Sequence, residues 1–120
     1  METPDDVKRD AVAKRAAARW EQVIKGAPGV AYDEYMSKAS RRVVSRGQFE
    51  GTVSKTAFKT ATVEKVECGQ DSCKATVVVT YDSRIIARAA NVERTIKGIQ
   101  NTMVESWIIE DGQVWYVWPQ

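Results

Sequence analysis

The only two cysteines of the chain, Cys68 and Cys73, lie in the stretch VECGQDSCKATVVV. The intervening GQDS is a short loop between two strand-like runs, so the two cysteines are expected to face each other across a hairpin. Directly opposed residues have Cβ atoms about 4.5–5.5 Å apart, which is close to the span of a disulfide. The sequence therefore predicts a Cys68–Cys73 disulfide that fixes the hairpin register, with a pair of reduced thiols as the alternative.

Proton-transfer chemistry would have to use carboxylates and tyrosines, because the sequence contains no histidine. This absence excludes an enzyme built on an Asp–His pair and removes the most common metal ligand, while two cysteines alone would leave a zinc site half complete. We therefore expect no metal and no cofactor. A site that combines a carboxylate with a tyrosine needs both groups in one apolar cavity. The weak candidates for such a site are Glu105, Asp33, Tyr32 and Tyr35.

Glu105 is the most informative of these carboxylates. It alternates with Met103 and Trp107, so the period of a strand places all three side chains on one face, inside the fold. A buried carboxylate costs several kcal/mol unless it is paired. An arginine partner, such as Arg94 or Arg84, would make Glu105 a structural residue rather than a catalytic one.

A long helix near the N-terminus is the first element that must position these residues. Two aspartates follow Thr3-Pro4, and apolar side chains then recur at helical spacing as far as Gly26. Small alanines on the inner face allow the helix to lie close to a sheet, with Trp20 pointing inward. The charged residues expected on its solvated face are Lys8, Arg9, Lys14, Arg15, Arg19 and Glu21.

Short helices are expected next. The range 30–37 predicts a helix with Asp33 and Glu34 on its exposed face and Tyr32 and Tyr35 in the core or a pocket. A basic break follows, which could bind an anionic ligand or an acidic partner surface, or could be a solvated loop that pairs with Glu50. Its cations are Lys38, Arg41, Arg42 and Arg46. The range 48–58 is a weaker prediction of a third helix, because it contains glycine.

The C-terminal half predicts antiparallel strands. The ranges 61–68, 74–81, 96–110 and 114–118 are rich in β-branched and aromatic residues, the range 84–91 is ambiguous, and Asp111-Gly112 marks a tight hairpin turn. Helices followed by strands indicate an α+β fold, here a long helix and one or two short helices packed on a curved antiparallel sheet, a cone-shaped roll. Residues 1–120 are expected to form a single domain.

The aromatic hairpin at the C-terminus suggests two kinds of surface. Val114, Tyr116 and Trp118 should face one way, and Trp115 and Val117 the other. Exposed aromatics on a sheet are typical of a protein interface, so Trp115, Val117 and Trp118 are interface candidates and a homodimer is expected. The candidates for an internal ligand pocket are Trp20, Tyr35, Tyr81, Met103 and Trp107.

Charge and hydropathy limit the partners and the location. A net charge of +2 without a concentrated basic face argues against nucleic acid, and no apolar run approaches the length of a membrane span. The predicted disulfide favours a periplasmic or exported protein, with a cytoplasmic one as the alternative. The polar start METPDDVKRD is not a signal peptide, so export would require a leader outside this sequence.

The order of these elements, the hairpin ESWIIEDGQVWYVW and the stretches AYDEYMSKASRR and VECGQDSCKATVVV together resemble the nuclear transport factor 2-like superfamily. The resemblance is to small bacterial exported members of this group, which have a cystatin-like α+β cone. It implies a wedge-shaped cavity between helix and sheet, and often a dimer through the sheet. It does not imply one activity, since this fold hosts enzymes, transport factors and assembly modules.

Two functions are compatible with these observations. The first is a non-enzymatic cone-fold domain that binds a small apolar ligand or an envelope protein partner and self-associates through its sheet. The second is a small enzyme like the ketosteroid isomerases, with Glu105 or Asp33 as the base and a tyrosine as the proton donor. The lack of a recognisable catalytic set favours the first.

Overall fold

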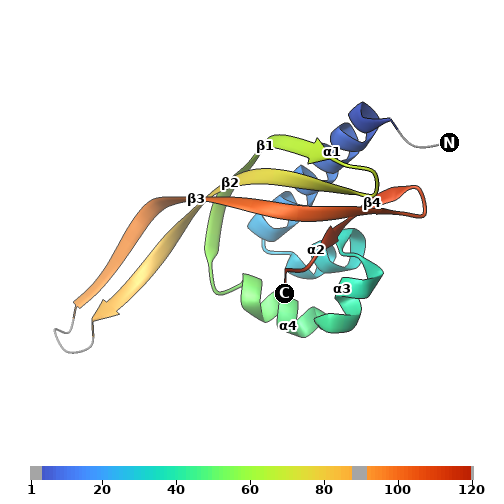
Figure 1. The fold of residues 1–120 in the computed structure, drawn as a ribbon. Coiled ribbons are helices and arrows are strands. Elements are labelled where there is room, and N and C mark those ends of the chain that lie inside the picture. Colours follow the sequence, from blue (N-terminus) through green and yellow to red (C-terminus); the bar gives the residue numbers. More distant parts are fainter. Residues whose placement is uncertain (1–3, 88–91, 120) are drawn as a thin grey trace.

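The computed structural model describes residues 4–87 and 92–119, except for the side chains of 84–87 and 92. It has the predicted α+β fold (Figure 1). The helices are α1 (Asp5–Ile24), α2 (Pro28–Tyr35), α3 (Lys38–Val43) and α4 (Arg46–Val53), and the strands are β1 (Ala57–Cys68), β2 (Ser72–Ala87), β3 (Val92–Glu110) and β4 (Gln113–Val117). The strands form one antiparallel sheet in the order β1-β2-β3-β4, and the sheet is open because β1 does not pair with β4 in the described part of the chain.

Helix α1 buries one stripe against the sheet. Val12, Ala16, Trp20 and Val23 recur every three or four residues and belong to the core. The helix ends before Gly26, whose φ of 87° requires the left-handed region that glycine adopts without strain. The inward placement of Trp20 is therefore confirmed. Thr3 lies outside the described residues, and Pro4 precedes the helix without a side-chain cap.

Two cations of α1 do not lie on a solvated face, and for Lys8 and Arg19 that prediction was wrong. Lys8 is only 5% exposed: its Nζ donates to the carbonyl of Gly69 at 2.8 Å and pairs with Asp5 at 3.0 Å. The flexible stem of a lysine can cover apolar surface while its ammonium reaches polar groups. Lys8 thus joins the start of α1 to the loop between the cysteines.

Serine caps explain why the basic break is a helix rather than an irregular loop. The Oγ of Ser37 accepts a hydrogen bond from the amide of Ser40 and begins α3. Ser45 forms a reciprocal capping box with Gln48, so α4 begins earlier than the predicted third helix and ends at Val53. A capping side chain satisfies amides that the first helical turn leaves free. The basic segment does pair with Glu50, as one alternative expected, through the Nη1 of Arg46, which lies 3.1 Å from Oε1 of Glu50.

The link between α2 and α3 closes the outer edge of β4. Met36 forms a parallel bridge with Tyr116, and the amide of Ser37 donates to the carbonyl of Tyr116 at 2.8 Å. The hydroxyl of Tyr32 donates to the carbonyl of Val44 at 2.7 Å and so holds the end of α3. These contacts tie the helical layer to the last strand.

Strands β2 and β3 form a ribbon that extends well past the other strands (Figure 1), in a molecule measuring 63 × 28 × 23 Å. The ladder shifts register between Tyr81 and Ser83, where the amide of Gly98 donates to the Asp82 carboxylate. Gly98 has a φ of 69°, as expected at a bulge. The ambiguous range 84–91 is partly resolved as strand, because β2 continues to Ala87, and 88–91 lie outside the described residues.

The core lies between α1 and the inner face of the sheet. Ala75, Val77 and Val79 of β2 and Trp107 of β3 are fully or almost fully buried, and Phe49 of α4 closes one end. None of the described helices combines the length and apolarity that crossing a bilayer requires.

The predicted disulfide is confirmed, because Cys68 and Cys73 are opposed in the β1–β2 register and bonded to each other. In the chain-entropy model, so small a loop contributes only about 2 kcal/mol. We expect reduction with dithiothreitol to lower the free energy of unfolding by about that amount and to leave the fold intact. Urea denaturation of oxidised and reduced protein, with thiol alkylation to verify each state, measures the difference. Unfolding upon reduction alone would contradict a role limited to hairpin register.

Candidate functional site

A buried ion pair lies at the centre of the inner face. Glu105 and Arg19 are each 4% exposed, and the Nη1 of Arg19 donates to the Oε2 of Glu105 at 2.9 Å. The indole of Trp20 also donates to Oε2 at 2.9 Å, and the indole of Trp107 donates to Oε1 at 3.4 Å. Glu105 therefore accepts three hydrogen bonds from two elements, α1 and β3.

Tyr116 forms the other side of this cluster. The Cζ of Arg19 lies 3.6 Å from the centre of the Tyr116 ring, in the geometry of a cation–π contact. Burial raises the pKa of the Tyr116 phenol above its ordinary value, and the Arg19 cation offsets part of that rise. The phenol consequently stays protonated at neutral pH and can act as a hydrogen-bond donor.

Arg19 retains an unused hydrogen-bond donor. Its Nε is buried and has no partner among the described residues. Unpaired buried polar groups are rare in folded proteins, and this N–H is free to donate to a molecule bound beside it. Arg19 is the residue of this candidate site that was not predicted from the sequence. The signal existed, because Lys8, Val12, Ala16, Arg19 and Val23 form one series of three- and four-residue steps.

Beside this cluster lies the inner hollow, a partly open cavity of about 270 Å³ between α1, α4 and the sheet. Its walls are mainly apolar, with Trp20, Phe58, Met103 and Trp118 among them, and it reaches Arg19 and Tyr116. The rings of Trp20 and Phe58 meet edge to face at 5.0 Å, which fixes one wall. Small-molecule sites typically combine such apolar walls with a few polar groups.

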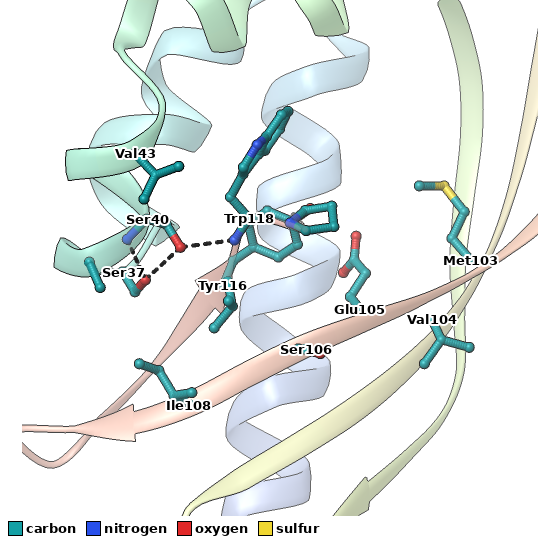
Figure 2. A pocket seen from close by; sticks show the side chains of 13 residues that line it. Ser37, Ser40, Val43, Met103, Val104, Glu105, Ser106, Ile108, Tyr116 and Trp118 are labelled. Atoms are coloured by element: carbon teal, nitrogen blue, oxygen red, sulfur yellow. Dashed lines mark hydrogen bonds between the residues drawn. The ribbon is translucent and has the colours of Figure 1, made fainter.

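A second depression, the edge groove, lies on the other side of the C-terminal segment and has a volume of about 480 Å³. Figure 2 shows it between β3 and the helical layer, with Val43 on one wall and Val104 on the other. Met103, Tyr116, Trp118 and Pro119 line both cavities. The last residues of the described chain therefore form the partition between the two.

The structure brings together only some of the predicted pocket residues. Trp20 and Met103 line the inner hollow, whereas Trp107 is fully buried and does not line it. Tyr81 packs against Phe58 at 6.1 Å between ring centres but does not line the hollow. Tyr35 lies apart from it, under the guanidinium of Arg15 at 4.7 Å.

The weak catalytic candidates are dispersed. Asp33 lies on the exposed surface and pairs with Arg46 at 3.2 Å, while the Tyr32 hydroxyl is engaged with backbone carbonyls. Glu105 does face inward, as the strand period predicted, but its partner is Arg19 rather than Arg94, which is exposed. The side chain of Arg84 lies outside the described residues. Among these candidates, Glu105 is the one that lines the groove between β3 and the helical layer.

The three interface candidates are less exposed than the alternation of side chains along the last strand suggested. Trp115 stacks with Arg15, whose Cζ is 4.9 Å from the ring centre, and its indole donates to the carbonyl of Glu110. Burial lowers the pKa of Arg15, and the negative charge of Glu34 offsets part of that decrease. The guanidinium nevertheless stays charged. Trp118 turns inward onto Phe49 at 5.6 Å, and Val117 is half-buried. A homodimer through these residues stays a prediction.

The described residues contain no group of three or more histidines, cysteines or carboxylates that could hold a metal ion. The polar groups that line the two cavities include a paired charge, a phenol and indoles. No protein-family model matches the chain, and a search of curated proteins finds no similar sequence.

Proposed function

We propose that the chain is a non-enzymatic ligand-binding domain that takes a small, neutral, apolar molecule with one hydrogen-bond acceptor into the inner hollow. The observation that carries this proposal is an apolar cavity of about 270 Å³ that reaches a buried guanidinium with an unused N–H. The resemblance to the nuclear transport factor 2-like superfamily, whose members have such a cavity, supports the same function. The disulfide is consistent with an exported domain.

The charge balance of the site argues for a neutral ligand. Arg19 and Glu105 already compensate each other. A carboxylate entering the hollow would add a third charge without a partner, and desolvating an unpaired charge costs several kcal/mol. A ketone, ester or hydroxyl oxygen has no such cost and could accept from Nε of Arg19, directly or through a water, after a small side-chain movement.

The same contacts weigh against the isomerase-like alternative. A general base must present a free lone pair to a carbon acid. Three donors already surround the Glu105 carboxylate, and Asp33 is on the surface in an ion pair. Glu105 is therefore better suited to positioning Arg19 than to abstracting a proton.

Binding of the neutral naphthyl ketone Prodan tests this proposal. We expect a blue-shifted, enhanced emission and saturable binding, with the naphthalene sulfonate ANS binding at least about tenfold more weakly because it brings a net charge. Thr52 is exposed at the wall of the hollow, so Thr52→Trp should block the site and weaken Prodan binding about tenfold without unfolding the protein.

Thr62→Trp is the matched control, because Thr62 is also exposed but lies on β1 and does not line the hollow. It should leave Prodan binding unchanged. Equal loss in both variants, or stronger binding of ANS than of Prodan, would refute a neutral ligand in the inner hollow.

A further inference from the structure

Strand β3 has an open edge beside the edge groove. The strand runs from Val92 to Glu110, but β4 pairs only with the part from Ser106 to Glu110. After Val117 the chain turns away, and the amide of Trp118 donates to Ser40 instead of continuing the ladder. Pro119, which has no N–H, follows. Among the described residues, β3 before Ser106 therefore pairs only with β2.

The register shows which backbone groups face that edge. Glu110 and Gln113 flank a two-residue turn with positive φ at both positions, so their backbone groups face each other. Alternation then directs the N–H and C=O groups of Val104, Thr102 and Gln100 away from β2. The amide of Ile109 donates to the carbonyl of Asp71, at the start of β2. Odd-numbered residues of this part of β3 therefore direct their backbone groups toward β2, which agrees with the even-numbered ones facing the open edge.

This edge lacks the protection that the other edges have. Strand β1 carries Lys59, Glu64, Lys65 and Glu67 and has two register shifts, while Met36 and Ser37 cover β4. Charges, bulges and coverage are the usual means of preventing unwanted pairing. The stretch IQNTMV of β3 has neither a charge nor a proline. Its unpaired groups can therefore accept another strand.

The edge groove runs along this open stretch. Val104 is 65% exposed and Val43 is 58% exposed, and both line the groove. Figure 2 shows that the side chain of Val104 lies on the opposite side of the β3 ribbon from that of Glu105. An added strand would find backbone partners on β3, and because its side chains alternate between two faces, those on one face would contact Val104 and those on the other would contact Val43.

Three cations lie next to residues that line the groove: Lys38 and Arg42 precede Ala39 and Val43 on α3, and Lys74 contacts Ser106. Arg19 balances the charge of Glu105, so this carboxylate adds no net negative charge to the groove. Lys38 and Arg42 are exposed on α3. The Nζ of Lys38 also forms an ion pair with the Oδ2 of Asp111 at 3.6 Å. Lys74 reaches over the sheet to donate to Ser106, which lines the groove. An occupant with acidic side chains would be complementary to this border.

We propose that the open edge of β3 binds an acidic peptide segment of a partner protein as an added strand, with β-branched side chains against Val43 and Val104. Addition of a strand uses backbone hydrogen bonds for affinity and alternate side chains for specificity. A second copy of this chain is less suitable, because pairing the edge with itself would place two positive borders on one continuous sheet.

A labelled synthetic peptide that alternates valine with glutamate and threonine tests the proposal by fluorescence anisotropy. We expect it to bind at least about tenfold more tightly than the same peptide with lysine in place of glutamate. Thr102→Pro removes one outward N–H and leaves the β2 ladder, so it should weaken binding about tenfold. Thr102→Val, which keeps the N–H, should bind like the unchanged protein, and Arg42→Gln should reduce the salt dependence.

The amide signals of Gln100, Thr102 and Val104 should shift in NMR spectra when the peptide binds. If Thr102→Pro does not fold, Gln100→Pro provides the same test at another outward amide. Absence of binding, equal affinity for the lysine peptide, or equal affinity of the proline and valine variants would overturn the proposal. So would a dimer in light scattering whose edge amides are protected before any peptide is added.

Discussion

Replacing Arg19 with methionine should lower the free energy of unfolding by about 3–5 kcal/mol, because it leaves the carboxylate of Glu105 buried without its cation. Trp20 and Trp107 would still donate to that carboxylate, but neutral indoles cannot balance its charge. The large effect comes from the partner left behind rather than from the pair itself, since desolvation of both charges offsets most of their attraction. Urea denaturation followed by circular dichroism measures the change.

The double variant Arg19→Met/Glu105→Leu separates these two contributions. With both charges removed, much of the lost stability should return, so that the double variant is more stable than Arg19→Met alone. Arg9→Met is the matched control on the same helix, because Arg9 is exposed and its replacement should change the free energy of unfolding by less than about 0.5 kcal/mol. A double variant less stable than either single variant would show that the pair contributes net stability, contrary to this expectation.

The sequence was sufficient to predict the order and type of most elements. Apolar spacing identified α1, strand alternation placed Glu105 with Met103 and Trp107, and the GQDS loop located the disulfide. Each of these signals is local and repeats within one element. The helical nature of the basic break was missed because the charges of α3 obscured its cap, Ser37.

The candidate site was less predictable because it depends on contacts between elements. Strand period fixed the face of Glu105, but only the packing of α1 on the sheet could show that Arg19 rather than Arg94 would reach it. Charge led us to place Arg19 in solvent, whereas its position in the apolar stripe of α1 placed it in the core. A cation in register with an apolar stripe therefore predicts a buried partner on the facing element.

The edge groove was not predictable from strand patterns at all. It exists because β4 is short and the chain after Val117 bonds to Ser40, and neither feature has a periodic signal. The inner hollow likewise depends on how α4 and the C-terminal residues meet. A cavity remains where two packed surfaces do not fill the space between them. The period of a sequence shows which side chains face that space, but it does not show how large the space is.

Replacing Trp107 with alanine should lower the free energy of unfolding by about 3–5 kcal/mol, the second large effect expected in this protein. Trp107 is fully buried, its ring meets that of Tyr116 edge to face at 5.9 Å, and its indole donates to Glu105. Alanine would therefore remove apolar contacts, open a cavity and withdraw one donor from a buried carboxylate. Urea denaturation of a variant that remains folded at low denaturant gives the value.

Trp115→Ala is the matched comparison, because it changes the same residue type on the neighbouring strand but on the other face of the sheet. Trp115 is only half-buried, so its loss should cost about 1–2 kcal/mol. If Trp107→Ala does not fold, Trp107→Phe keeps most of the ring volume and should still cost more than Trp115→Phe, since only the former loses a bond to a buried charge. Equal costs at the two positions would mean that both faces of the β3–β4 hairpin are covered, and the one-sided core described above would then be wrong.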